Sequence, residues 1–413
     1  MNKNNKPEIR FKGFTDAWEQ RKLEDMCSLI TKQTGFDYSA TIKPSLVKSK
    51  DENTYSFIQN KDFEGMNINL DTDFYIPVDV AEKYPKITLD QPSLLISISG
   101  KIGNVGLYSL NKNAFIGGAV GICKLKNIED GKTALYELLA PTGQKYFELL
   151  VKASSHANIT VEDIRNIVVH LPQNEEEKKK INNYFEELDN LITLHLCKLE
   201  KLQKIKESLL EKMFPKDGNS LPEIRFKGFT DAWKQCKFGD LGSVAMCKRI
   251  FKEQTTESGD VPFFKIGTFG GEPDAYISRE LFEEYKEKFN YPEVGDTLIS
   301  ASGTIGRTVE YTGEDEYFQD SNIVWFKHDD RVDNTYLKCV YSFVKWAGIE
   351  GSTIKRLYND NFLKTEFSIP NIDEQRKIGE YFARLDTLIT LHQRKLEKLK
   401  IIKKSMLEKM FVK

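Results

Sequence analysis

The sequence predicts an α/β (α+β) fold that is built twice, as two globular domains that are each followed by a long helix. Twelve residues, PEIRFKGFTDAW, occur at 7–18 and again at 222–233. A Gly-rich segment recurs inside each half, as LISISGKIG at 95–103 and LISASGTIG at 298–306. A long amphipathic segment ends each half. Because internal repeats mark duplicated structural units, we expect a tandem of two large units with a pseudo-two-fold internal repeat.

The long segment at 172–214 has the residue spacing of a coiled-coil helix. From Ile181 its apolar residues follow one another by four and three, as the a and d positions of heptads do. The same seam returns from Ile378 in the segment 370–413. A helix of roughly 40 residues is ~60 Å long. An amphipathic helix needs a partner, so we expect the two helices to pack on each other as a spacer. The seam residues are Phe185, Leu188, Ile192, His195, Leu199 and Leu202 in the first helix, and Phe382, Leu385, Ile389, His392, Leu396 and Leu399 in the second.

The globular domains are predicted to be strand-rich. LLISIS and TLISAS alternate apolar and polar residues as half-buried strands do, and NIVVHLP and EFSIP are expected to run as strands into the proline before each helix. Short helices are expected at 136–151 and 336–344. Between the shared segments the sequences of the two halves diverge, so one scaffold is combined with two different intervening sequences. The predicted boundaries are 1–171 and 222–369 for the globular domains, 172–214 and 370–413 for the spacer helices, and 215–221 for the linker.

Charge and composition limit the classes of function. The formal net charge is −2 with a pI near 6.3, which counts against a nucleic-acid-binding protein, although a balanced total can hide a basic face. The six cysteines form no C-x-x-C pair, so we expect reduced thiols in a cytosolic protein and no zinc site. No apolar run reaches the ~18 residues that span a bilayer. The expected protein is cytoplasmic and holds no metal.

The Gly-rich segments are the first candidates for ligand contact. Their glycines match neither a dinucleotide-binding nor a phosphate-loop pattern. One interpretation is a tight hairpin whose glycines adopt positive φ. The other is a loop whose amides and polar tips approach a DNA backbone or a base edge. The polar side chains on these loops are Ser99, Lys101 and Asn104 in the first half, and Ser302, Thr304 and Arg307 in the second.

A second candidate precedes each long helix. STIKRLYNDN at 352–361 combines Lys355 and Arg356, which suit phosphates, with Tyr358 and Asn359, which can reach base edges. A solvated surface loop is the alternative. The aligned segment of the first half carries His156 and Asn158 with fewer cations, so any contacts with DNA are expected to differ between the halves.

Catalytic and metal-binding signatures are missing from the sequence. It contains no base-flipping loop, methyl-donor loop, nucleophile elbow, Walker motif or H-E-x-x-H motif. His195 and His392 occupy matching seam positions, where a polar residue helps to fix the register. Two histidines without further ligands make a weak metal site. If the helices run antiparallel, these two residues should lie close together near the helix midpoints.

The chain resembles the specificity subunit of type I restriction–modification systems over nearly its whole length. The resemblance rests on the two-fold repeat, the two Gly-rich segments, STIKRLYND before Pro370, and IPNIDEQRKIGEYFARLD at 369–386. It implies two target-recognition domains that each read one half of a split, asymmetric DNA site, separated by an antiparallel coiled coil. It also implies a subunit with no catalytic centre. The implied partners are two modification subunits, which use S-adenosylmethionine, and two restriction subunits, which use ATP and Mg.

Two similar domains on a helical spacer would act as a ruler. Half-sites read on one face of B-DNA lie about one turn, ~34 Å, apart. Four added helical residues would move one end by ~6 Å, about two base pairs. Two alternatives stay open at this point, namely a self-contained DNA methyltransferase with a target domain and a coiled-coil DNA-binding scaffold or regulator.

Overall fold

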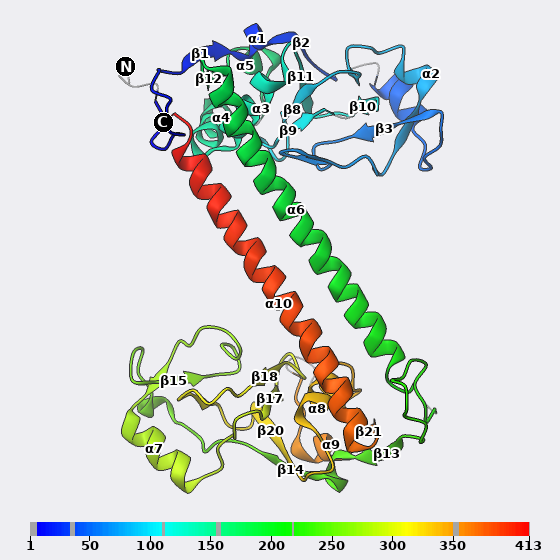
Figure 1. The fold of residues 1–413 in the computed structure, drawn as a ribbon, viewed down its shortest axis with the longest axis vertical. Coiled ribbons are helices and arrows are strands. Elements are labelled where there is room, and N and C mark those ends of the chain that lie inside the picture. Colours follow the sequence, from blue (N-terminus) through cyan, green and yellow to red (C-terminus); the bar gives the residue numbers. More distant parts are fainter. Residues whose placement is uncertain are drawn as a thin grey trace. The chain divides into compact units, whose positions relative to one another are not determined.

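A computed structural model of the chain contains two compact units (Figure 1). Unit 1 consists of Met1–Cys197 with Arg394–Lys413, and unit 2 consists of Lys198–Gln393. Both boundaries fall inside a long helix, so each unit holds the greater part of one long helix and the end of the other. The structure describes residues 6–33, 38–109, 112–153, 158–216, 219–349 and 355–412, apart from the side chains of residues 152 and 153.

Unit 1 is built around a four-stranded antiparallel sheet with the order β2-β11-β8-β9. A second sheet has the order β6-β3-β10-β7, and in it β3 and β10 are parallel. Two further strand pairs, β1-β12 and β4-β5, are antiparallel. The strands are β1 (Glu19–Lys22), β2 (Cys27–Lys32), β3 (Thr54–Ile58), β4 (Phe63–Glu64), β5 (Asn67–Ile68), β6 (Tyr75–Pro77), β7 (Thr88–Leu89), β8 (Ser93–Ser97), β9 (Val105–Tyr108), β10 (Ala114–Ile116), β11 (Val120–Leu125) and β12 (Val168–Leu171).

Unit 2 repeats most of this topology in its described residues, with three strands instead of four in the second sheet. Its four-stranded sheet has the order β14-β20-β17-β18, its second sheet the order β16-β15-β19 with β15 and β19 parallel, and β13 pairs with β21. The predicted fold class is therefore confirmed, and its mainly antiparallel sheets make it α+β. The strands are β13 (Lys234–Lys237), β14 (Gly242–Ala245), β15 (Val261–Phe264), β16 (Tyr276–Ile277), β17 (Thr297–Ser300), β18 (Thr308–Glu310), β19 (Tyr317–Phe318), β20 (Ile323–His328) and β21 (Glu366–Ile369).

Most helices pack against one face of the four-stranded sheet of their unit, whereas α2 (Val78–Ala81) and α7 (Arg279–Lys288) pack beside the second sheet. The prediction of one helix at 136–151 was wrong in detail, because α3 ends at Leu139 and Pro141 starts a separate helix. The helices of unit 1 are α1 (Leu23–Met26), α2 (Val78–Ala81), α3 (Ile128–Leu139), α4 (Pro141–Ala153) and α5 (Val161–Arg165), with the short turns η1 (Tyr38–Ile42) and η2 (Lys43–Ser45). Those of unit 2 are α7 (Arg279–Lys288), α8 (Asn334–Tyr341) and α9 (Asn359–Lys364), with η3 (Phe238–Asp240) and η4 (Lys252–Gln254). The long helices are α6 (Glu175–Lys212) and α10 (Ile372–Lys409).

The strands β8 and β17 of the four-stranded sheets are buried on both faces. In β8, Leu94 and Ile96 join the cluster beneath the helices, whereas Leu95 joins the cluster shared with the second sheet. In β17, Ile299 and Leu298 divide between two clusters in the same way. All five residues of β8 are buried, so the expectation of half-buried strands was wrong. The second sheet, built from the divergent sequence, covers the face that the sequence pattern assigned to water.

Each long helix begins at a polar cap. The Asn174 side-chain oxygen accepts hydrogen bonds from the backbone N–H groups of Glu176 at 2.9 Å and Glu177 at 3.3 Å. The Asn371 side chain does the same for Glu374 at 3.0 Å. Both helices carry acidic residues in the first turn, where the helix dipole favours negative charge.

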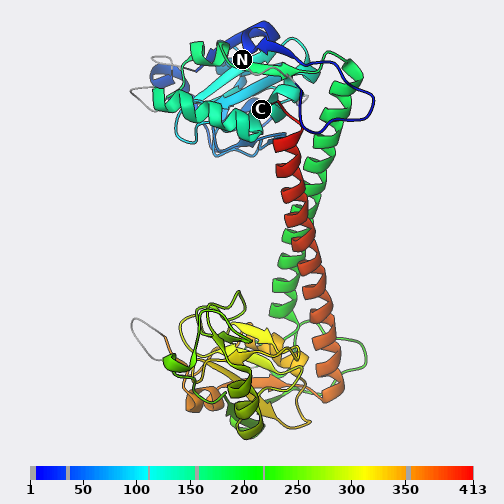
Figure 2. The same cartoon turned by 90° about the vertical axis from the view of Figure 1, so that its left-hand side faces the viewer.

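In unit 1 the start of α6 and the end of α10 pack antiparallel (Figure 2). The rings of Phe185 and Phe411 lie 5.7 Å apart, and Asp189 forms an ion pair with Lys403. As the residue number rises along α6, that of its partner falls along α10, which is the mark of antiparallel packing. Burial and the adjacent Asp189 carboxylate raise the pKa of Tyr136, whose hydroxyl donates to that carboxylate at 3.2 Å.

Unit 2 repeats the arrangement with the helices exchanged. Lys206 of α6 pairs with Asp386 of α10 at 2.5 Å, and the rings of Phe214 and Phe382 lie 6.3 Å apart. Of the predicted seam residues, Phe185, Leu188, Phe382, Leu385 and Leu396 are buried, and Ile192, His195, Leu199, Leu202, Ile389, His392 and Leu399 are half-buried. His195 belongs to unit 1 and His392 to unit 2, and their proximity stays a prediction.

The repeated twelve residues clamp two helix ends together in each unit. We call these twelve residues the lead-in. The lead-in of unit 1 binds the start of α6 through Arg10, whose guanidinium donates to both carboxylate oxygens of the buried Glu177 at 2.6 and 2.8 Å. It binds the end of α10 through the Ile9 N–H, which donates to the Lys409 carbonyl at 2.9 Å. The matching contacts of unit 2 are Arg225 to Glu374, at 2.7 Å for both bonds, and Ile224 to Lys212 at 2.9 Å.

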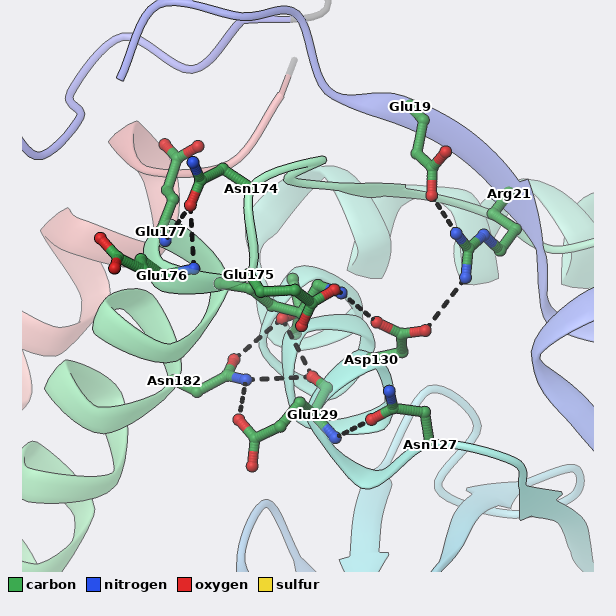
Figure 3. Close-up of polar contacts among 12 residues, drawn as sticks. Glu19, Arg21, Asn127, Glu129, Asp130, Asn174, Glu175, Glu176, Glu177 and Asn182 are labelled. Atoms are coloured by element: carbon green, nitrogen blue, oxygen red, sulfur yellow. Dashed lines mark hydrogen bonds and ion pairs between the residues drawn. The ribbon is translucent and has the colours of Figure 1, made fainter. Parts of the chain in front are cut away.

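A buried polar network joins α6 to α3 in unit 1 (Figure 3). The Asn182 amide donates to the Glu129 carbonyl and carboxylate at 3.0 and 2.8 Å and accepts from the Thr133 hydroxyl at 2.9 Å. In unit 2 the matching residue of α10 is Gly379, where a Cβ would lie 1.9 Å from the Thr335 hydroxyl oxygen. The glycine therefore lets α10 approach α8 more closely than any other residue would.

We predict that Gly379→Ala lowers the melting temperature of the chain in calorimetry. Alanine favours a helix over glycine by ~1 kcal/mol, but overpacking a tight contact costs ~1–3 kcal/mol, and here the new methyl overlaps Thr335. Gly267→Ala is the control, because no heavy atom lies within 4 Å of its added Cβ. A melting temperature at or above that of the wild type for Gly379→Ala would contradict the close approach.

Candidate nucleic-acid interface

The Gly-rich segments form tight turns at one end of each four-stranded sheet. In unit 1 the turn follows β8, and Gly100 and Gly103 have φ angles of 75° and 86°. In unit 2 it follows β17, and Gly303 and Gly306 have φ angles of 70° and 87°. The hairpin prediction is confirmed, since these conformations favour residues without a Cβ.

The segment before each long helix pairs with this turn. In unit 2 the Gly303 N–H donates to the Lys355 carbonyl and the Leu357 N–H donates to the Ala301 carbonyl, both at 2.9 Å. In unit 1 the Ile159 N–H donates to the Ile98 carbonyl at 3.0 Å. The two stretches that the sequence singled out separately therefore form one edge in each unit, which we call the reading edge.

The reading edge of unit 2 presents cations, an aromatic ring and an amide. Lys355, Arg356, Tyr358 and Asn359 are exposed, and so is Thr304. Arg356, Tyr358 and Asn359 line a cavity of about 600 Å³ together with Met246, Ser321 and Lys364. Among the described residues, the guanidinium of Arg356 has no side-chain partner. An exposed cation beside a concave surface suits a phosphate group or a base edge.

Two side chains of unit 2 that were predicted from the sequence to contact DNA are less accessible to a ligand. Ser302 is buried, with a relative exposure of 6%. The Arg307 guanidinium lies 5.3 Å from the centre of the Phe269 ring and donates to the Ile266 carbonyl at 3.2 Å. Arg307 therefore ties the turn to the neighbouring loop, although it remains exposed.

The reading edge of unit 1 presents different chemistry. Lys101 and Asn158 are exposed and Ser99 is half-buried. Asn104 is buried, and its amide donates to the Phe63 carbonyl at 2.7 Å and the Asn60 carbonyl at 3.0 Å. The Asn104 amide therefore holds the turn in place, and its contact with DNA stays a prediction. His156 lies outside the described residues.

The segment KRIFK at 248–252, which continues the chain beyond β14, was not singled out from the sequence. Arg249 donates from Nε to an Asp320 carboxylate oxygen at 2.9 Å, Lys248 lies 4.9 Å from the centre of the Phe289 ring, and Phe251 is 56% exposed. Three cations and a phenylalanine within five residues are a basic and aromatic signal that a search for nucleic-acid contacts should find.

The thiols of unit 2 are unsuited to nucleophilic chemistry. Burial raises the pKa of Cys236 to about 11 and of Cys247 and Cys339 to about 12, so these groups stay protonated at neutral pH. Within the described ranges, no group of three or more His, Cys, Asp or Glu side chains could hold a metal ion. No helix of the described part has the length and apolar character needed to span a membrane.

Comparisons with known proteins agree with this two-fold construction. The chain matches the family described as type I restriction modification DNA specificity domain twice, over residues 15–207 and 230–401. A Haemophilus influenzae protein named as a type I restriction enzyme specificity subunit is 58% identical over 156 residues, which cover 38% of this chain and 40% of that protein. A type I restriction enzyme specificity subunit of Methanocaldococcus jannaschii is 22% identical over 374 residues, which cover 84% of this chain and 86% of that protein.

The fold is also similar to that of a solved structure. The S subunit of a type I restriction–modification system from M. genitalium aligns over 99% of both chains with a TM-score of 0.67 and 16% sequence identity. The two family matches together span most of the sequence. Each match contains one globular domain and most of one long helix. The chain therefore belongs to the type I restriction–modification DNA specificity family.

Proposed function

We propose that this chain is the sequence-specificity subunit of a type I restriction–modification complex, in which each unit reads one half of a bipartite, asymmetric DNA site. The chain supplies recognition and leaves catalysis to its partners. These are two modification subunits that use S-adenosylmethionine and two restriction subunits that use ATP and Mg.

The observation that carries this proposal is that the reading edges of the two units have the same backbone arrangement but different side chains. Both units bring a Gly-rich turn and a pre-helix segment together through equivalent backbone hydrogen bonds. Unit 2 fills that edge with Lys355, Arg356 and Tyr358, whereas unit 1 offers Lys101 and Asn158. A protein that reads two different half-sites with one architecture needs this combination.

The charge of the chain fits a shared binding task. Cations concentrate at the reading edge of unit 2, although the formal net charge of the whole chain is −2. Binding to DNA depends on neutralising phosphates with Lys and Arg. The modification subunits therefore supply part of that neutralisation, and this chain supplies the choice of sequence.

The long helices have two roles in this proposal, which are to fix the gap between the half-sites and to dock the modification subunits. Their seams face inward within each unit, yet matching leucines remain on the surface. Leu191 and Leu194 of α6 are 42% and 46% exposed, and Leu388 and Leu391 of α10 are each 43% exposed. Apolar pairs repeated at matching places on two helices suit a repeated partner.

Reconstitution tests the proposed function. The purified chain is combined with the modification subunits encoded beside its gene and S-adenosylmethionine, and methylated positions are mapped on genomic DNA. We expect methylation at one bipartite sequence with a fixed gap, and none without this chain. Methylation that ignores sequence, or an isolated chain that transfers methyl groups by itself, would refute the proposal.

Removing two cations from the reading edge of unit 2 should weaken DNA binding. Lys355→Ala with Arg356→Ala is expected to lower the affinity of the complex roughly 10-fold and to reduce the slope of log K against log salt concentration by about 2. Lys327→Ala with Arg331→Ala is the matched control, since both residues are exposed and lie at the opposite end of β20. Equal affinity and slope in the two double variants would remove this edge from the DNA interface.

Lengthening both helices should change the gap and leave the half-sites unchanged. One heptad inserted after His195 and one after His392 keeps the seam in register and adds ~10 Å of helix, which equals about three base pairs. Methylation mapping then compares the consensus with that of the wild type. A heptad in one helix only is the control, because it should slip the seam and abolish methylation. An unchanged gap in the double insertion would refute the ruler.

A further inference from the structure

The turn between β19 and β20 holds an arginine in a fixed position. Arg249 donates from Nε to a carboxylate oxygen of Asp320 at 2.9 Å, and the Ser321 hydroxyl donates to the same oxygen at 2.9 Å. The Asp320 side chain is 16% exposed, whereas that of Arg249 is 59% exposed. The anchor is therefore sheltered and the guanidinium head is open to solvent.

This pairing leaves the two Nη groups of Arg249 available. Arg331 offers a contrast, because its Nη2 donates to the Asp329 carboxylate at 2.7 Å and to the Asp240 carbonyl at 2.8 Å. Arg279 likewise uses an Nη group on Asp315. Among the described residues, no acceptor takes the Nη groups of Arg249. A guanidinium held at Nε with both Nη groups free presents a fork of donors in a preset direction.

The turn that anchors this fork borders the reading edge of unit 2, because the Ala301 N–H donates to the Asn322 carbonyl at 2.7 Å. Ser321, the neighbour of Asp320, lines the same cavity as Arg356 and Tyr358. Ser321 also has a φ of 55°, a left-handed conformation that non-glycine residues adopt at a cost and that often marks functional sites. The turn is therefore held in a strained form at the place where the exposed cations gather.

We propose that Arg249 reads a guanine in the half-site bound by unit 2, with Asp320 as the residue that orients it. Guanine presents two acceptors, O6 and N7, in the major groove, and the paired donors of arginine match them. An orienting carboxylate lowers the entropy that is lost on binding, because the side chain is ordered beforehand. This inference rests on the proposed function and adds the base and the residue that reads it.

The matching turn of unit 1, which lies within the described residues, lacks this device. At the offset that aligns the two Gly-rich segments, Gly117 and Gly118 occupy the places of Asp320 and Ser321. A Cβ on Gly117 would lie 2.6 Å from the Phe57 ring, so no orienting side chain fits there. The corresponding turn of unit 1 cannot anchor an arginine in this way, which agrees with two half-sites of different sequence.

The test maps methylation by the reconstituted complex of Arg249→Ala. We expect the preference for guanine to fall roughly 5- to 150-fold at one position of one half-site, while the other half-site and the gap stay unchanged. Wild-type complex should also bind a duplex with 7-deazaguanine at that position more weakly, because the N7 acceptor is gone, and Arg249→Ala should bind both duplexes equally.

Two further variants separate orientation from fold and charge. Asp320→Ala should weaken the preference for guanine at the same position less than Arg249→Ala does. This variant removes the carboxylate that orients the Arg249 guanidinium, but the guanidinium itself remains. Arg331→Ala, an exposed arginine at the other end of β20, should keep the wild-type consensus.

Three outcomes overturn the inference. The first is an unchanged consensus in Arg249→Ala. The second is a uniform loss of binding that leaves the consensus intact, which would assign Arg249 to a phosphate. The third is a wild-type complex that methylates no bipartite site, which would refute the proposed function and this inference with it.

Discussion

The structure depends on one kind of contact, in which the last turn of a long helix completes a core that other segments began. Phe411 at the end of α10 packs 6.0 Å from the Trp18 ring and 5.7 Å from the Phe185 ring. Phe214 at the end of α6 meets Trp233 at 5.8 Å in the same way. Aromatic side chains bury large apolar areas, so a unit without its incoming helix end would expose much of its core. Because each helix ends in the core where the other begins, both must be present and they run in opposite directions within each unit.

This contact also explains which parts of the sequence repeat. The lead-in holds both helix ends through Arg10 and Ile9 in unit 1, so its residues are fixed by buried geometry. Glu177, the partner of Arg10, is almost fully buried, and a buried carboxylate that loses its cation is strongly destabilising. The exposed side chains of the reading edges have no such role in holding the helix ends. These side chains can change without opening the core, which lets one frame carry two different sets of contacts.

The candidate site was predictable in part. Lys355, Arg356 and Tyr358 were found from the sequence because cations beside an aromatic residue carry their own signal, and the structure exposes all three. The role of Asn104 within its turn was not visible in the sequence, because a polar residue in a glycine-rich turn looks the same whether its amide faces solvent or buried carbonyls. Arg249 was missed as an oriented side chain, since its anchor Asp320 lies far along the chain and meets it only when β14 and β20 pair.

The sequence by itself determined the duplication, the two long helices, the strands that lead into them and the left-handed glycines, because each of these follows from local spacing or from one residue's steric freedom. Tertiary structure decided the rest. It set the second sheet with its parallel strand pair, the burial of both faces of β8, and the meeting of each Gly-rich turn with its pre-helix segment. These features come from hydrogen bonds and packing between residues that are distant in sequence, and the periodicity of a single segment carries no record of its partner.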